Sequence, residues 1–478
     1  MSGHSGRISG LAFDAAHHAL VSSADDGLIK LWSLDDSGRE LLSLAFMGRS
    51  DWLVVTPDGE FDGTASALRA MGWRLGSSNE VVPLDSLYND FFSPLLFQET
   101  LASTASRGRK QRKLPRRDIA SVLQLPGLRA MLNQSLASVR VREGRSVLCM
   151  PVKANVNVSL FADALPYSLE PNSGIARPDD PNCAMEYPLP EAQLYELTST
   201  TPLMRPLDRA VAPDRPGRLS SVSGSTLHVQ TIAVSEYARP LPSLPASPSS
   251  AAAVGTLFER NQRTGRSPFR DTRVWSPLVD DAATLHGIMR RLDEIAAAAE
   301  PDNVVLLLLS GHGRVPPGQE MYYFLPSGFV DSNPMQVRDA GLSTAMLADA
   351  VRRMPVGRII LVIDSCQSGG AVDSLLKIAS AKTRLWQGAR KPQASQQPSA
   401  TYILAATTPW DAASQSLESG KTAFIEELTN ALNAPGAHTI RGIAAQLKRS
   451  FEQRKHEGRD VSVHLIESAG ADFPIAGR

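Results

Sequence analysis

The chain has 478 residues, enough for roughly two to four domains of about 100 to 200 residues each. Its 49 basic residues balance its 49 acidic residues, so no overall field attracts nucleic acid or an anionic membrane. The chain does not open with a basic segment followed by an apolar one, and no apolar run approaches the roughly 18 residues that span a bilayer. We therefore expect a soluble protein that is not exported and has no membrane partner.

Cysteine is rare in this chain. Cys149, Cys183 and Cys366 include no Cys-x-x-Cys pair and are too few for a disulfide framework or a zinc site. Such sparse usage is typical of a reducing compartment, which predicts a cytoplasmic location.

Residues 1–45 contain short strand-like runs around a turn at Asp25-Asp26-Gly27. The runs are Ile8–Phe13, Ala19–Ser22 and Leu28–Trp32. This segment resembles one WD repeat, since Gly3-His4 opens it, Leu31-Trp32 closes it, and Ser33 stands where the repeat usually has Asp. One blade cannot bury its own faces. Either the chain is a truncation of a longer propeller protein, or the blade packs on the next segment of the chain; the resemblance implies a protein partner.

The sequence of residues 46–105 predicts two strands around a turn at Pro57-Asp58-Gly59. An amphipathic stretch follows from Leu84 to Leu101. Within residues 106–134, seven basic side chains lie between Arg107 and Arg117. No aromatic residue is interleaved there to stack on bases, so a solvated linker is favoured over a nucleic-acid or membrane patch. Salt-dependent retention on DNA that vanishes when the run is neutralised would favour the nucleic-acid alternative.

Residues 135–225 carry short strand-like runs from Val139 to Val158 and then many prolines between Pro166 and Pro216. We interpret this part as a small β-rich module that continues into an irregular connector. An immunoglobulin-like module is one form of this interpretation.

From residue 226 onward, strand and helix patterns alternate, which predicts an α/β sandwich with a mainly parallel sheet over residues 226–478. Two unbroken apolar runs, Val304–Leu309 and Ile359–Ile363, are typical of parallel strands buried on both faces. Further strands are expected at Thr226–Val234, Thr272–Leu278, Tyr322–Leu325 and Tyr402–Ala406. Helices are expected at Ala251–Asn261, Ala282–Ala299 and Leu342–Met354, and two more near the C-terminus. A proline-rich loop is expected at Arg239–Ser250.

A small polar cluster follows each of the two apolar runs: Ser310-Gly311-His312-Gly313 and Asp364-Ser365-Cys366-Gln367-Ser368-Gly369. In an open parallel sheet, reacting groups gather beyond the carboxyl ends of the strands, so His312 and Cys366 are expected to share one crevice. A thiolate attacks a carbonyl carbon, and an imidazole that titrates near neutrality protonates the departing amine. Alone, a histidine after a strand usually packs or caps and a buried cysteine is usually inert. Their joint occurrence predicts a catalytic dyad.

Gly311 and Gly313 flank His312, and Gly369 lies three positions after Cys366. Backbone N–H groups at tight turns can point at a developing oxyanion without a side chain in the way. We assign the oxyanion hole to the amides of Gly313 and Cys366.

Residues 226–478 are similar to the caspase family, and the two polar clusters are closest to its metacaspase and bacterial orthocaspase branch. Cys366 follows His312 by 54 positions, near the roughly fifty of caspases. The block Asp51–Gly63 looks like the segment that joins WD repeats to caspase domains in bacterial proteins. The resemblance implies a caspase-hemoglobinase sandwich and hydrolysis of a protein or peptide substrate through an acyl-enzyme on Cys366, without a metal or organic cofactor in that chemistry.

The resemblance also assigns Asp364 and Ser310 to an acidic pocket that accepts Arg or Lys before the scissile bond. A strand-end residue that satisfies loop amides is the alternative for Asp364. The family usually has another pocket acid in the loop after the first strand, and Leu241–Ser250 contains none, so Glu236 or Asp411 would have to substitute. The calcium-binding acidic cluster of many metacaspases is not recognisable, which leaves calcium dependence open.

The segment Ala371–Ala400 separates the halves that correspond to a large and a small subunit, and its composition predicts an exposed loop. Self-cleavage there would mature the enzyme, after one of five basic residues: Lys377, Lys382, Arg384, Arg390 and Lys391. Gly420-Lys421-Thr422 imitates the end of a phosphate-binding loop, but Gln415 stands where its first glycine must be.

A catalytically silent caspase-fold scaffold for protein contacts is the alternative from another functional class. The intact His, Cys and Gly set argues against it, because a pseudoenzyme has no chemical need for these residues.

Overall fold

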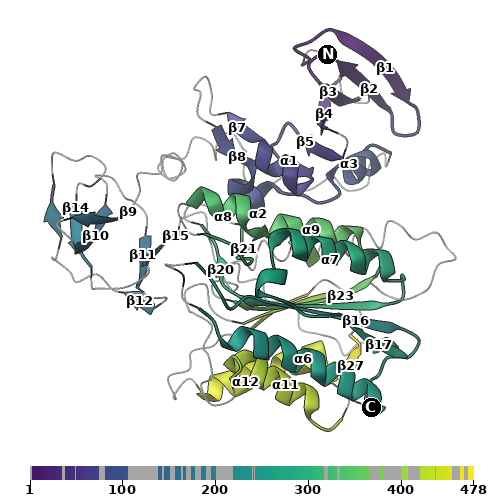
Figure 1. Cartoon of the computed structure of the whole chain (residues 1–478). Coiled ribbons are helices and arrows are strands. Elements are labelled where there is room, and N and C mark those ends of the chain that lie inside the picture. Colours follow the sequence, from purple (N-terminus) through teal and green to yellow (C-terminus); the bar gives the residue numbers. More distant parts are fainter. Residues whose placement is uncertain are drawn as a thin grey trace. The chain divides into compact units, whose positions relative to one another are not determined.

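The computed structural model describes residues 3–34, 38–48, 50–74, 81–105, 138–142, 145–150, 157–162, 165–167, 174–177, 183, 185–189, 195–200, 219–238, 241, 243–316, 321–330, 334–365, 377–379, 400–406, 420–436, 438–454, 463–467 and 472–477. The chain divides into two compact units, Met1–Leu132 and Asn133–Arg478. Figure 1 labels their helices and strands. In these described ranges, no helix is both long enough and apolar enough to cross a membrane.

The N-terminal unit is built on a six-stranded antiparallel sheet whose spatial order follows the chain. Its strands are β1 (Ile8–Asp14), β2 (Ala19–Ala24), β3 (Leu28–Ser33), β4 (Glu40–Met47), β5 (Asp51–Val55) and β6 (Phe61–Gly63). The sheet therefore continues across the boundary expected at residue 45. A core cluster joins Leu31, Leu42 and Val54 of the sheet to Leu96 of α3 (Leu96–Ala105), so this helix covers part of one face.

The amphipathic stretch from Leu84 to Leu101 is divided into short pieces. They are η1 (Leu84–Leu87), α2 (Tyr88–Phe91) and the start of α3, and α1 (Ala65–Ala70), β7 (Gly72–Arg74) and β8 (Val81–Pro83) precede them. Leu95 adopts a φ of 68°, and its N–H donates to the Asp62 carboxylate at 2.7 Å. The chain thus turns between α2 and α3, next to Pro94, where a continuous helix cannot form.

The second unit begins with two small antiparallel sheets, in the orders β13-β14-β10-β9 and β12-β11-β15. The strands are β9 (Ser138–Arg142), β10 (Arg145–Met150), β11 (Asn157–Ala162), β12 (Leu165–Tyr167), β13 (Ile175–Ala176), β14 (Met185–Pro188) and β15 (Tyr195–Thr200). A disulfide joins Cys149 of β10 to Cys183, a pairing that their spacing of 34 residues did not indicate. One disulfide is not the framework that the sequence analysis excluded, and the cytoplasmic location stays a prediction.

The rest of the second unit is a layered α/β structure, which confirms the predicted architecture. The central sheet has the order β17-β16-β19-β23-β24-β26, with β18 beside β16; all neighbours are parallel except β24 and β26. Its strands are β16 (Thr226–Ala233), β17 (Asp271–Val274), β18 (Leu278–Val279), β19 (Val304–Gly311), β23 (Arg358–Ser365), β24 (Ala400–Ala406) and β26 (Val463–Glu467).

Helices cover both faces of this sheet (Figure 1). They are α6 (Ala246–Arg263), α11 (Ala423–Asn433) and α12 (Ile440–Arg454) on one face and α7 (Leu285–Ala298) and α9 (Thr344–Arg353) on the other. The core between the sheet and the first group joins Leu306 and Leu308 of β19 to Phe258, Phe424 and Leu447. Because side chains alternate along a strand, Val305, Leu307 and Leu309 face the second layer, which is why residues 304–309 of β19 are all apolar.

Several elements differ from the sequence-based expectation. The strand expected at Thr272–Leu278 is two strands, β17 and β18. Helix α6 begins at Ala246, inside the predicted loop, because Pro248 falls in the first turn, where backbone N–H groups need no helical partner. Residues Leu342–Ser343 form strand β22, and the Ser343 hydroxyl caps α9 by accepting the Met346 N–H at 3.2 Å. The antiparallel edge strand β26 was not predicted, because its alternating pattern lacks an apolar run.

Two further small sheets complete the described fold. One contains β20 (Gly313–Arg314), β21 (Tyr323–Phe324) and β22, and it begins two residues after the end of β19. The other pairs β25 (His438–Thr439) with β27 (Pro474–Ala476). A short helix, α8 (Pro334–Ala340), lies in the chain between β21 and β22.

Candidate functional site

The register of β19 and β23 brings the two polar clusters of the sequence to one edge of the central sheet. Ser310 lies opposite Asp364 and Gly311 opposite Ser365, at the carboxyl ends of two neighbouring parallel strands. His312 comes directly after Gly311 in the chain. Cys366, which comes directly after Ser365, and Asp411 both lie outside the described residues. The structure therefore places Ser310, Asp364, His312 and Gly313 together and leaves the position of the candidate nucleophile untested.

His312 is the single residue between the central sheet and the small sheet that starts at β20. Its backbone N–H donates to the Tyr237 hydroxyl at 2.9 Å, and its carbonyl accepts the Leu325 N–H at 2.9 Å. The Tyr237 ring also packs on the imidazole, with a distance of 4.6 Å between the ring centroids. Only 7% of His312 is exposed. The backbone of His312 is thus held on both sides of its Cα atom.

The two glycines beside His312 are needed for close packing. A Cβ atom on Gly311 would lie 2.7 Å from the Tyr237 hydroxyl, and one on Gly313 would lie 2.5 Å from the Tyr322 hydroxyl and 2.7 Å from Ser365 Oγ. Neither glycine has a positive φ. Hydroxyl groups fill the space that the missing side chains leave, and the assignment of the oxyanion hole to the amides of Gly313 and Cys366 stays a prediction. The Tyr322 and Ser365 hydroxyls hydrogen-bond to each other at 2.5 Å directly beside Gly313.

Asp364 is a buried carboxyl group in which one of the two oxygens accepts hydrogen bonds from described residues. Its Oδ2 accepts the Ser310 hydroxyl at 3.1 Å and the Thr422 hydroxyl at 2.8 Å, whereas Oδ1 is buried without a hydrogen-bond partner among the described residues. Burial raises the pKa of Asp364 to about 6, and the hydrogen bonds from Thr422 and Ser310 only partly oppose this rise. An unpaired buried carboxylate oxygen can accept hydrogen bonds from a cationic ligand. The alternative of Asp364 satisfying loop amides finds no such contact in the described part of the chain.

Thr422 is the site residue that sequence reasoning missed. It is the N-cap of α11, where its oxygen accepts the Ile425 N–H at 3.3 Å while its proton goes to Asp364. A threonine before an apolar helical pattern is a recognisable cap signal. That signal predicts the cap but not the contact with Asp364, which lies 58 positions earlier in the chain.

Of the other predicted site residues, the structure describes Glu236, which directly precedes Tyr237, and Lys377. Glu236 is exposed, and its N–H donates to Asp280 at 3.1 Å. Lys377 is half-buried in a helical turn whose next residues, Ile378 and Ala379, are 1% and 0% exposed, so the prediction of an exposed loop is wrong for residues 377–379. The remaining self-cleavage candidates lie outside the described residues: Lys382, Arg384, Arg390 and Lys391.

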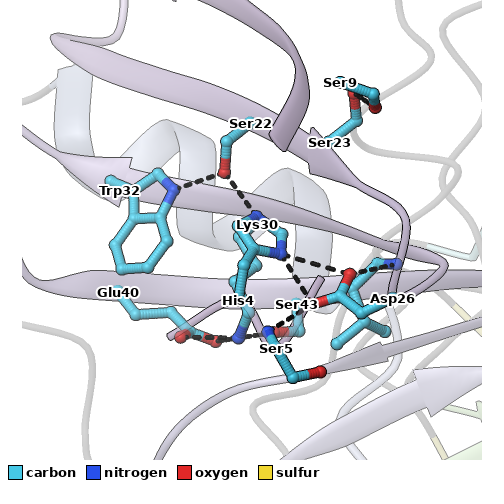
Figure 2. A network of polar contacts seen from close by, with 11 residues as sticks. His4, Ser5, Ser9, Ser22, Ser23, Asp26, Lys30, Trp32, Glu40 and Ser43 are labelled. Carbon is cyan, nitrogen blue, oxygen red and sulfur yellow. Dashed lines mark hydrogen bonds and ion pairs between the residues drawn. The ribbon is translucent and has the colours of Figure 1, made fainter. Parts of the chain in front are cut away.

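A second polar network lies in the N-terminal sheet (Figure 2). His4 pairs through Nδ1 with Asp26 at 2.9 Å and through Nε2 with Ser22 Oγ at 2.7 Å, and the same Ser22 oxygen accepts the Trp32 indole N–H at 2.8 Å. These contacts imitate a Ser-His-Asp triad. However, Ser22 is 2% exposed and its oxygen already takes the indole proton, so a substrate cannot reach it.

This network attaches the N-terminal residues to the sheet. Burial favours a higher pKa for Asp26, but hydrogen bonds from the His4 side chain and from the Leu28 and Ser5 N–H groups outweigh it and lower the pKa to about 2. Beside it, the Lys30 ammonium contacts Glu40 at 2.8 Å and Ser43 at 2.8 Å. We interpret the network around His4 and the contacts of Lys30 as structural rather than catalytic.

Within the described ranges, no group of three or more His, Cys, Asp or Glu side chains is arranged to hold a metal ion.

Comparison with known proteins agrees with the layered fold. Residues 253–469 match the family model of the caspase domain. No curated protein matches the chain. A crystal structure of protein GSU0716 from Geobacter sulfurreducens is similar at 14% identity, over 52% of this chain and 93% of that chain, with a TM-score of 0.35, which is too slight a likeness to carry an inference. The chain therefore contains a caspase-fold domain, and this family match supports a cysteine-peptidase-like function.

Proposed function

We propose that this protein is a cysteine endopeptidase of the metacaspase and orthocaspase branch, with His312 and Cys366 as its catalytic dyad. The observation that carries the proposal is the register of β19 and β23, in which Gly311 lies opposite Ser365. His312 and Cys366 are the next residues after these two in the chain. Consecutive Cα atoms are about 3.8 Å apart and neighbouring strands about 4.8 Å, so this register supports a histidine and a thiol at one sheet edge.

The proposed reaction has two stages. The Cys366 thiolate forms a bond to the carbonyl carbon of the scissile peptide, and the N–H groups of Gly313 and Cys366 stabilise the negative charge on its oxygen. When the C–N bond breaks, the His312 imidazolium gives its proton to the departing amine, and the acyl group remains on Cys366 as a thioester. His312 then takes a proton from water, which attacks the thioester and releases the acid and the free thiol.

We further propose that the residue before the scissile bond is Arg or Lys, and that Asp364 selects it. The unpaired Oδ1 of Asp364 supports this specificity, because Ser310 and Thr422 occupy only Oδ2 among the described residues. A guanidinium or ammonium group would supply the missing hydrogen bonds and the positive charge. Asp411 and Glu236 stay candidates for a second acid of the pocket.

Fluorogenic peptides with Arg, Lys or Asp before the scissile bond test the proposal directly. We expect the wild-type protein to hydrolyse the Arg and Lys peptides and to leave the Asp peptide intact, and we expect Cys366→Ala to hydrolyse none. A folded wild-type protein that cleaves no peptide would instead favour the silent scaffold. Cleavage of the Asp peptide alone would retain the peptidase and refute the basic specificity.

Self-cleavage within residues 371–400 is the expected route of maturation. After one purification protocol, intact mass spectrometry should find wild-type chains split after Lys382, Arg384, Arg390 or Lys391, and Cys366→Ala chains whole. Lys377 is a weaker candidate, because a protease must bind an extended segment and Ile378 and Ala379 are buried in a helical turn. Equal intact masses for the two proteins would refute self-maturation.

A further inference from the structure

The loop after β16 crosses the end of β19 at the residue we propose as the catalytic base. The last paired residues of the two strands are Ala233 and Ser310, and the Val234 N–H still donates to the Ser310 carbonyl at 2.9 Å. Beyond this point the strands no longer pair. The backbone N–H of His312 therefore takes a side-chain partner, the hydroxyl of Tyr237.

Tyr237 closes a ring of hydrogen bonds around His312. Its hydroxyl accepts the His312 N–H at 2.9 Å and donates to the Leu325 carbonyl at 3.0 Å, and the Leu325 N–H donates back to the His312 carbonyl at 2.9 Å. The Tyr237 ring lies against the imidazole at an angle of 59° between the ring planes. One side chain therefore contacts both the backbone and the ring of His312.

The loop that carries Tyr237 is itself anchored. Asp280 accepts the Ser235 N–H at 2.6 Å and the Ser235 hydroxyl at 2.9 Å, and it also accepts the Glu236 N–H. Asp280 holds this position with a φ of 43°, which is costly for a residue other than glycine. The three hydrogen bonds offset that cost. Gly311 completes the arrangement, because any side chain there would collide with the Tyr237 hydroxyl.

We propose that Tyr237 is a positioning residue, which fixes His312 at the end of β19 so that its imidazole faces the thiol of Cys366. This inference rests on the proposed function. Proton transfer and thiolate stabilisation both depend on the placement of the imidazole to within a fraction of an ångström. Tyr237 acts through His312 and does not touch the substrate.

Tyr237→Phe removes only the hydroxyl and keeps the ring. We expect kcat for the Arg peptide to fall about tenfold to a hundredfold, with KM within about twofold. Tyr402→Phe is the matched control, because Tyr402 is also buried in this domain and its hydroxyl contacts Asp472 at 3.4 Å, far along the sheet from His312. It should leave both kinetic constants unchanged. In a His312→Ala background, Tyr237→Phe should have no further effect on the residual rate.

Alkylation of Cys366 by iodoacetamide gives a second readout that needs no substrate. Cys149 and Cys183 are joined to each other, so Cys366 is the thiol available without reduction. An imidazolium beside the thiol favours the thiolate, so the pH midpoint of alkylation should rise in Tyr237→Phe toward that of His312→Ala. A wild-type protein that cleaves no peptide would refute the proposed function. The pH midpoint of Cys366 alkylation would then still test whether Tyr237 positions His312. An unchanged midpoint, or a Tyr237→Phe effect that persists without His312, would overturn the inference.

Discussion

Alanine at His312 is expected to cost nearly as much peptide hydrolysis as alanine at Cys366, about a thousandfold or more in kcat/KM. The two side chains act as one unit. Without the imidazole, the thiol is mostly protonated at neutral pH and the departing amine receives no proton. The double variant should therefore be no slower than either single variant, which kcat/KM for the best Arg peptide will show.

The control for this prediction is His438→Ala. His438 is half-buried in the same domain, and its ring hydrogen-bonds to the Ala434 carbonyl at 2.9 Å, in the layer of helices α11 and α12. It should retain wild-type kcat/KM. If His312→Ala kept more than about a tenth of the wild-type value, His312 could not be the general acid and base of the reaction.

Asparagine at Asp364 is expected to reduce cleavage after Arg and Lys by about a hundredfold or more, because a buried cation would lose the anionic partner that selects it. We expect the same substitution not to destabilise the folded protein at neutral pH. The pKa of Asp364 is raised to about 6 in the folded state from an ordinary 3.8, so ionising it while buried lowers the free energy of unfolding as pH rises between these values. This cost is about 3 kcal/mol, and Asp364→Asn removes it. Thermal unfolding at pH 8 should show a variant at least as stable as the wild type.

The same pKa gives a prediction for binding. A cation needs the ionised carboxylate, so the affinity for acetyl-arginine amide, measured by calorimetry on Cys366→Ala, should rise with pH through about 6 and then level off. Thr422→Val removes a hydrogen bond that stabilises the ionised form, so it should move this midpoint to higher pH, whereas Thr422→Ser should not. If Cys366→Ala bound acetyl-arginine amide weakly and with an affinity that did not change with pH, the role of Asp364 in specificity would be contradicted.

The central part of the site could be predicted from the sequence because it depends on local patterns. The apolar runs of β19 and β23 lack alternation, which identifies buried parallel strands, and parallel strands end at one edge of a sheet. His312 and Cys366 were therefore expected to follow two strands at one edge of the sheet. The resemblance, not the strand pattern, placed Ser310 and Asp364 in one pocket, and their side-chain oxygens lie 3.1 Å apart.

The supporting contacts could not be predicted, because each depends on how separate elements pack. Tyr237 reaches a residue 75 positions later, and Thr422 reaches one 58 positions earlier. Neither position carries a local signal for its partner. The disulfide between Cys149 and Cys183 likewise results from the pairing of short strands, which the proline-rich sequence around them conceals. Cys366 and Asp411 lie outside the described residues, and their roles stay predictions.

Labelling with a peptidyl arginine acyloxymethyl ketone, which alkylates an activated thiol beside a bound arginine side chain, tests the proposed catalytic pair most directly. Digestion and mass spectrometry should find one adduct per chain, on Cys366, in the wild-type protein, and almost none in His312→Ala after the same time. Equal labelling of Cys366 in the two proteins, or no labelling of the folded wild type, would contradict the claim that His312 and Cys366 form a catalytic pair.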